Sequence, residues 1–147
     1  MTPASLLVVC ALALLAPSTA RAADARREVR AVWITTLLGL DWPKPGSAAE
    51  QRASLRAIVG ELAAAGYNTI FFQVRGRGDA MYRSRFEPWS AQLSGTLGRD
   101  PGWDPLAVLL EDAHAAGMEV HAWFNTVKVG AVTPGRANEG NILVLER

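Results

Sequence analysis

The sequence has little of what several common kinds of functional site require. Cys10 is the only cysteine among the 147 residues, which excludes a disulfide framework and a cysteine-based zinc site. The two histidines, His114 and His121, do not form an HExxH pair, so we expect no metal site and no cofactor. The 15 Lys+Arg and 14 Asp+Glu nearly cancel without a basic block, which argues against nucleic-acid binding. With 50% hydrophobic residues, the chain is predicted to fold as at most one globular domain.

The N-terminal residues are typical of a secretory signal peptide. Leu6–Ala16 is an apolar run of about 11 residues, too short to cross a bilayer. Ala20 and Ala22 supply the small residues that signal peptidase needs, so we predict residues 1–22 as signal peptide, cleaved after Ala22. We therefore expect a secreted or periplasmic protein that has no stable membrane span once the signal peptide is cleaved. Because residues 1–5 contain no Lys or Arg, an uncleaved or misassigned start is the alternative.

After a short linker at residues 23–28, strand and helix patterns alternate. Three segments rich in β-branched and aromatic residues predict strands at Val29–Thr36, Asn68–Arg75 and Met118–Asn125. An apolar stripe with a Ser47–Glu50 capping box predicts a helix over Ser47–Ala65, with Gly66 as its stop signal. A second helix is predicted from Pro105, with Asp104 as N-cap and Gly117 as the stop signal.

The βαβαβ order predicts an α/β fold with parallel strands, because a helical crossover returns the chain to the same end of the sheet. Sequential strand order with both helices on one side is expected for a (β/α)8 TIM-type barrel. A different order, or helices on opposite faces, would favour a doubly wound sheet. A barrel needs eight units, so we expect residues 29–147 to be a partial barrel domain, the front part of a larger one, with a further strand beginning near Asn141–Leu145.

Polar residues near the carboxyl ends of two strands predict a binding site. Ligands of α/β folds bind at this edge, where Gln73 and Arg75 end one strand and His121 and Asn125 the next. The connection of about 28 residues after Arg75 is far longer than the usual 2–6, which is typical of a functional loop. The predicted substrate-binding residues, including two from this loop, are Gln73, Arg75, Asp79, Trp89, His121 and Asn125.

Each of these residues also has a structural interpretation. Arg75 and Gln73 would be structural if Arg75 paired with a carboxylate from a strand outside this chain, and His121 could be a core imidazole. The tryptophans at 42, 89 and 103 could stack on sugar rings or anchor their loops, whereas core packing is the default for Trp33 and Trp123. The glycines of Gly76–Met81 begin like a dinucleotide fingerprint, but Met81 replaces the third glycine and no helix follows directly, so the match is weak.

Several of these motifs, in this order, resemble the glycosyl hydrolase-like 10 family. The resemblance rests on the segments Arg30–Thr36, Leu40–Pro43, Asn68–Arg75, Gly78–Ala80, Pro88–Ser90, Asp104–Leu106 and His121–Asn125, and on Gly95 and Gly98. It implies a secreted or lipid-anchored bacterial protein with a (β/α)8 barrel that hydrolyses bacterial glycans such as peptidoglycan sugars. Thr126-Val127-Lys128 departs from the Pro-Tyr-Arg of many members.

Three functions follow from these observations. The leading one is the N-terminal portion of a secreted glycoside hydrolase with a carbohydrate substrate. Hydrolysis needs two carboxylates, and none of the predicted strands ends in Glu, so we expect the catalytic pair beyond this chain. The alternatives are a non-catalytic carbohydrate-binding module and a doubly wound cofactor-binding domain. The sequence does not define an oligomeric state.

Overall fold

The computed structural model describes residues 28–127. The predicted signal peptide, the first residues of the linker, Lys128 and the strand expected near 141–145 lie outside these residues. Three parallel strands are present, β1 (Ala31–Ile34), β2 (Thr69–Arg75) and β3 (Glu119–Phe124). The two crossover helices are α2 (Ala48–Ala64) and α4 (Pro105–Ala115). The predicted strands are shorter than expected by one to four residues, chiefly because β1 gives way to a turn at Thr35.

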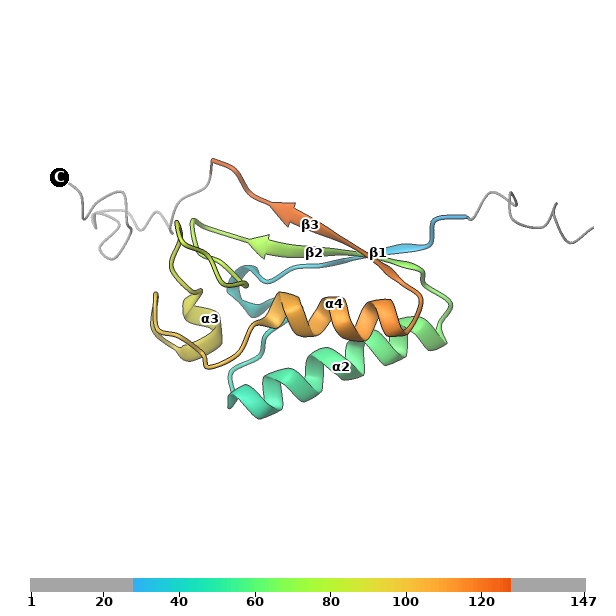
Figure 1. Ribbon diagram of the computed structural model, residues 1–147, viewed down its shortest axis with the longest axis horizontal. Helices are drawn as coiled ribbons and strands as arrows, with labels where there is room; N and C mark the ends of the chain where they lie inside the picture. The colour runs from blue at the N-terminus through green and yellow to red at the C-terminus, as the bar shows by residue number, and fades with distance from the viewer. Residues whose placement is uncertain (1–27, 128–147) are drawn as a thin grey trace, which may run out of the picture.

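The strands are ordered β1-β2-β3, and both helices cover the same face of the sheet (Figure 1). This confirms the predicted strand order and the placement of the helices on one side. It also removes the strand-order argument for a doubly wound sheet, in which helices cover both faces. Every connection between these strands returns the chain by a helix, as parallel pairing requires.

The predicted helix-end signals are all used. Ser47 accepts a hydrogen bond from the Glu50 backbone N–H while the Glu50 side chain accepts one from the Ser47 N–H, which completes the capping box. Asp104 caps α4 through the Ala107 N–H, with Pro105 in the first turn. Gly66 follows α2 with a φ of 82°, a left-handed conformation that glycine adopts without strain.

The core lies between the sheet and the two helices. Ile34, Phe72 and Val74 face the helices and are at most 3% exposed, and they pack with Leu55 of α2 and Leu109 of α4. Two loop tryptophans, Trp42 and Trp103, are 1% and 5% exposed and meet edge to face with ring centroids 5.9 Å apart. Of the two interpretations left open for them, loop anchoring is the one that their burial supports.

The other face of the sheet carries an exposed row of rings. Trp33 is 58% exposed, so the prediction that it packs in the core is wrong for the described residues. Trp33 alternates along β1 with Ile34, which faces the helices, so the Trp33 side chain lies on the opposite face. No other element within residues 28–127 forms a second layer on that face (Figure 1). Strand β3 is exposed or half-buried at every position because it forms an edge of this sheet.

The connection between β2 and α4 is more ordered than a plain loop. It contains a one-turn helix, α3 (Ala91–Ser94), and Ala80 forms isolated bridges with both Arg75 and Trp89. The Ala80 N–H donates to Pro88 O at 2.8 Å, and the Ser90 N–H donates to Ala80 O at 3.0 Å. These bonds fold the loop back over the end of β2.

Candidate functional site

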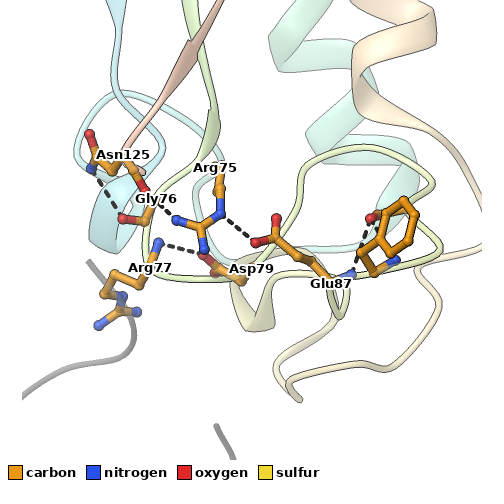
Figure 2. A network of polar contacts seen from close by, with 8 residues as sticks. Arg75, Gly76, Arg77, Asp79, Glu87 and Asn125 are labelled. Carbon is orange, nitrogen blue, oxygen red and sulfur yellow. Dashed lines mark hydrogen bonds and ion pairs between the residues drawn. The ribbon is translucent and has the colours of Figure 1, made fainter. Parts of the chain in front are cut away.

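The carboxyl ends of the three strands are joined by a network of hydrogen bonds. The Asn125 N–H donates to Arg75 O at 3.0 Å, and the Asn125 side chain donates to Gly76 O at 3.1 Å. In return, the Arg75 guanidinium donates to the Asn125 carbonyl, as Figure 2 shows. The structure therefore brings together two of the predicted site residues from adjacent strand ends.

Arg75 also forms an ion pair with Glu87 on the loop (Figure 2). The two side chains are 14% and 21% exposed, so most of the pair is removed from water. The carboxylate that the structural interpretation assigned to a strand outside this chain is therefore supplied by the β2–α4 loop. No regular spacing predicts this pairing, because Arg75 and Glu87 are 12 positions apart along an irregular loop.

Gln73 holds the turn after β1 in place. It is 1% exposed, and its Oε1 accepts the backbone N–H groups of Thr36 at 2.9 Å and Leu37 at 2.8 Å. The Thr36 hydroxyl donates to the Gln73 carbonyl at 2.9 Å. Because the amide oxygen is already shared among protein donors, the structural interpretation accounts for Gln73 better than direct substrate contact.

Asp79 closes the turn that follows β2. It is 8% exposed, and its Oδ1 accepts the Arg77 N–H at 2.8 Å. A Cβ placed on Gly76 would lie 3.7 Å from Asp79 Oδ1 and 3.9 Å from Gln73 Oε1, so both side chains gather around this glycine.

The two remaining predicted residues lie apart from this network. Trp89 is half-buried against the core and is fixed by its backbone bridge to Ala80. His121 lies on the exposed face of the sheet, beside Phe71, with Nε2 3.6 Å from Glu119 Oε2. Its side chain is 53% exposed, so it does not belong to the core that residues 28–127 form.

Four carboxylates lie on the loops near this edge, Asp41, Asp79, Glu87 and Asp100, and all of them have partners within the protein. Asp41 accepts the Thr35 N–H at 2.7 Å, and Asp100 accepts the Gly102 N–H at 2.7 Å. Asp79 and Glu87 are engaged as described above. No group of three or more His, Cys, Asp or Glu suited to a metal ion occurs within residues 28–127, and none of the helices described there is both long and apolar enough to cross a bilayer.

A surface cavity of about 550 Å³ lies away from this network. It is bounded by the start of α2 and by α3, and its lining includes Gln51, Arg99 and Asp100 but none of the six predicted site residues. The candidate site is therefore defined by the strand ends and not by this cavity.

Parallel βα units with a polar edge at the strand carboxyl ends define an α/β chain of the kind that binds ligands at that edge. Residues 28–142 match the family model described as glycosyl hydrolase-like 10. The chain belongs to this family, as its motifs indicated.

Named relatives agree with this assignment. The chain is 41% identical over 109 residues to the glycosyl hydrolase YngK of Bacillus subtilis (strain 168). It is 40% identical over 123 residues to the glycosyl hydrolase DigH of Escherichia coli (strain K12). These alignments cover 73% and 77% of this chain but 21% and 28% of the relatives, so the chain spans about a quarter of their length.

Proposed function

We propose that this chain is the N-terminal portion of the (β/α)8 barrel of a secreted or periplasmic glycoside hydrolase that acts on bacterial glycan strands such as peptidoglycan sugars. The observation that carries the proposal is the sequential order β1-β2-β3 with both helices on one face. A closed barrel requires this arrangement, since each right-handed βα unit places its strand beside the previous one. Family membership and the names of both relatives support the hydrolase class.

The catalytic pair belongs, in this proposal, to later strands. Glycoside hydrolysis uses two carboxyl groups. Within the described residues, the four carboxylates near the strand ends are bound by backbone N–H groups or by Arg75. The described part of the chain would then contribute to substrate binding and shape one side of the site.

Because these carboxylates are bound by groups within the protein, they equally favour a second candidate, a carbohydrate-binding module without catalysis. In that case the strand-end network would hold a glycan that no residue of the protein cleaves. The two candidates predict the same binding but differ in turnover.

Reading the encoding DNA beyond the Arg147 codon tests the proposal. We expect an in-frame continuation with Glu or Asp at the ends of two later strands, and release of soluble fragments from purified peptidoglycan by the encoded protein. Substituting either of these carboxylates should abolish release while glycan binding persists. A reading frame that stops without such strands, or binding without release by the intact protein, would support the binding module instead.

A further inference from the structure

The surface cavity beside α3 is a second concave region at the end of the sheet where the strands terminate. One wall is the start of α2 with the residues before it, and the other is α3 with the loop that leads to α4. Figure 1 shows α3 and the first turn of α2 at the end of the molecule toward which the strand arrows point. The volume of about 550 Å³ lies within the roughly 300–1,000 Å³ that is usual for ligand sites. We call this region the α2–α3 cavity.

Contacts within the described residues hold the two walls together. Gln51 of α2 is 3% exposed, and its Nε2 donates to Lys44 O at 3.3 Å and to Gln92 O of α3 at 3.2 Å. Leu93 of α3 is 4% exposed and packs in the core. The hollow between the walls is therefore built by the first two βα units themselves. It does not arise from a surface that later strands of a barrel would cover.

One polar atom of the cavity wall lacks a partner. Gln51 Oε1 is buried and accepts no hydrogen bond from any group within residues 28–127. The two carbonyl groups that accept from Nε2 determine which end of the amide is the nitrogen. Buried polar side-chain atoms of native proteins nearly always have a partner. Because Gln51 lines the cavity, a donor group of a bound molecule, such as a hydroxyl, would supply the missing one.

The opening of the cavity carries a donor and an acceptor on consecutive residues. Arg99 and Asp100 are exposed lining residues, and neither forms an ion pair within residues 28–127. Asp100 Oδ1 accepts the Gly102 N–H at 2.7 Å, and no described group donates to Oδ2. A guanidinium beside a carboxylate oxygen suits sugar hydroxyls, which both donate and accept hydrogen bonds. Pro45 and Pro101 add apolar surface that suits the C–H groups of a sugar ring.

The cavity adjoins the strand-end network through one residue of α3. The Gln92 carbonyl accepts from Gln51 in the cavity wall, and Gln92 also borders the small space beside Gly76 and Asp79. A polymeric ligand that lies along this end of the molecule can therefore occupy the strand ends and the cavity together. Contacts at two such places on one chain raise its affinity without any change at the reacting bond.

We propose that the α2–α3 cavity binds a sugar unit of the glycan strand at a distance from the bond that is cleaved. Arg99 and Asp100 bind the hydroxyls of this unit at the opening, and Gln51 Oε1 accepts from a hydroxyl that reaches the cavity wall. This inference rests on the proposed function, because that function supplies the glycan. The cavity then selects long strands over short fragments and takes no part in the chemical step.

The test uses the protein encoded by the complete reading frame, with long peptide-free peptidoglycan strands and a tetrasaccharide prepared from them as probes. Arg99→Ala is expected to weaken the affinity for long strands by about tenfold, because it removes a charged hydrogen-bond donor. Asp100→Asn keeps an oxygen for the Gly102 N–H and should weaken the affinity by about threefold. Neither change should alter the affinity for the tetrasaccharide. The matched control is Arg83→Ala, which removes an exposed arginine of the same connection that does not line the cavity.

Three measurements separate sugar binding from a structural role: dissociation constants per folded molecule, melting temperatures, and hydrogen exchange with and without the probes. If the parent cleaves the strands, the dissociation constants are measured in a background that lacks one catalytic carboxylate. We expect unchanged melting temperatures, and slower exchange at residues 94–101 when long strands are bound. Unchanged affinity in both cavity variants overturns the inference, whatever the melting temperatures. An equal loss for the tetrasaccharide, or an equal loss in Arg83→Ala, overturns it as well.

Failure of the inference and failure of the proposed function give different results. Hydrolysis of the strands by a parent whose affinity does not depend on Arg99 and Asp100 refutes the distant sugar site but leaves the hydrolase intact. Binding of long strands that requires both residues, without hydrolysis, supports the cavity and refutes the hydrolase. Absence of binding to both probes refutes both.

Discussion

Replacing Arg75 with alanine should mainly destabilise the protein. The substitution leaves the Glu87 carboxylate, 21% exposed, without its cationic partner and removes a donor to the Asn125 carbonyl. Breaking a fully buried ion pair costs about 3–5 kcal/mol, and the residual exposure of both side chains places this pair near 3 kcal/mol. Loss of a charged hydrogen bond to substrate alone would instead weaken glycan binding by about 2–3 kcal/mol without altering stability.

A double-mutant cycle measures the pair directly. Unfolding of the complete protein in guanidinium chloride is compared for Arg75→Ala, Glu87→Ala and the double variant, with glycan affinity measured per folded molecule. We expect a coupling free energy of about 1–3 kcal/mol and a double variant less destabilised than the sum of the two. Arg75→Ala with unchanged stability and a large loss of affinity would refute this reasoning and assign the guanidinium to substrate.

Three further predictions concern the sheet edge, the turn after β1 and the start of α2. The isolated 147-residue chain should self-associate in analytical ultracentrifugation, because the unpaired edge of β3 and the face of the sheet that carries Trp33 are exposed; a monomer with one cooperative melt would contradict this. Gln73→Leu orphans two N–H groups and should cost about 2–4 kcal/mol, with faster hydrogen exchange at Thr36 and Leu37; unchanged exchange would disprove the anchoring role. Ser47→Ala should cost about 1 kcal/mol through the lost cap. Because hydrogen bonds from the Ser47 backbone N–H and then from its side chain lower the pKa of Glu50, the stabilisation that they give is present above the ordinary pKa of glutamate, about 4.3, and is lost as the pH falls through the lowered value; a Glu50→Gln variant, which lacks the titrating group, with the same acid sensitivity as the parent would contradict it.

The sheet and helices were predictable because their signals are local. The capping box at Ser47, the N-cap at Asp104 and the stop at Gly66 are set by residues within one or two turns, and the structure confirms all three. Parallel pairing followed from the helical crossovers, and sequential strand order was expected for a TIM-type barrel. The short helix α3 was missed because one turn is too brief to produce a periodic pattern.

The roles of the site residues were less accessible to sequence reasoning. Pairing of Arg75 with Glu87 depends on how an irregular loop folds back, and burial of Gln73 depends on a turn 36 residues earlier in the chain. Exposure of Trp33 likewise depends on which elements cover one face of the sheet, which an aromatic residue in a strand pattern does not encode. The assignment of the predicted residues to substrate stays a prediction.

The match between strand order and chain order has a consequence for how the protein is assembled. Within the described sheet, β2 pairs with β1 and β3 pairs with β2, so each of these pairings can form as soon as its crossover has been made. Ala31 pairs with Thr69 and Thr69 with Glu119, so each pairing closes a long crossover, which makes a parallel sheet slow to form even when folding proceeds from the N-terminus during synthesis. At every stage the newest strand presents an open edge that can accept only one more strand. The described sheet thus acts as a template for the strand that follows β3. A change at β3 affects the strands that are added after it, while β1 and β2 remain paired.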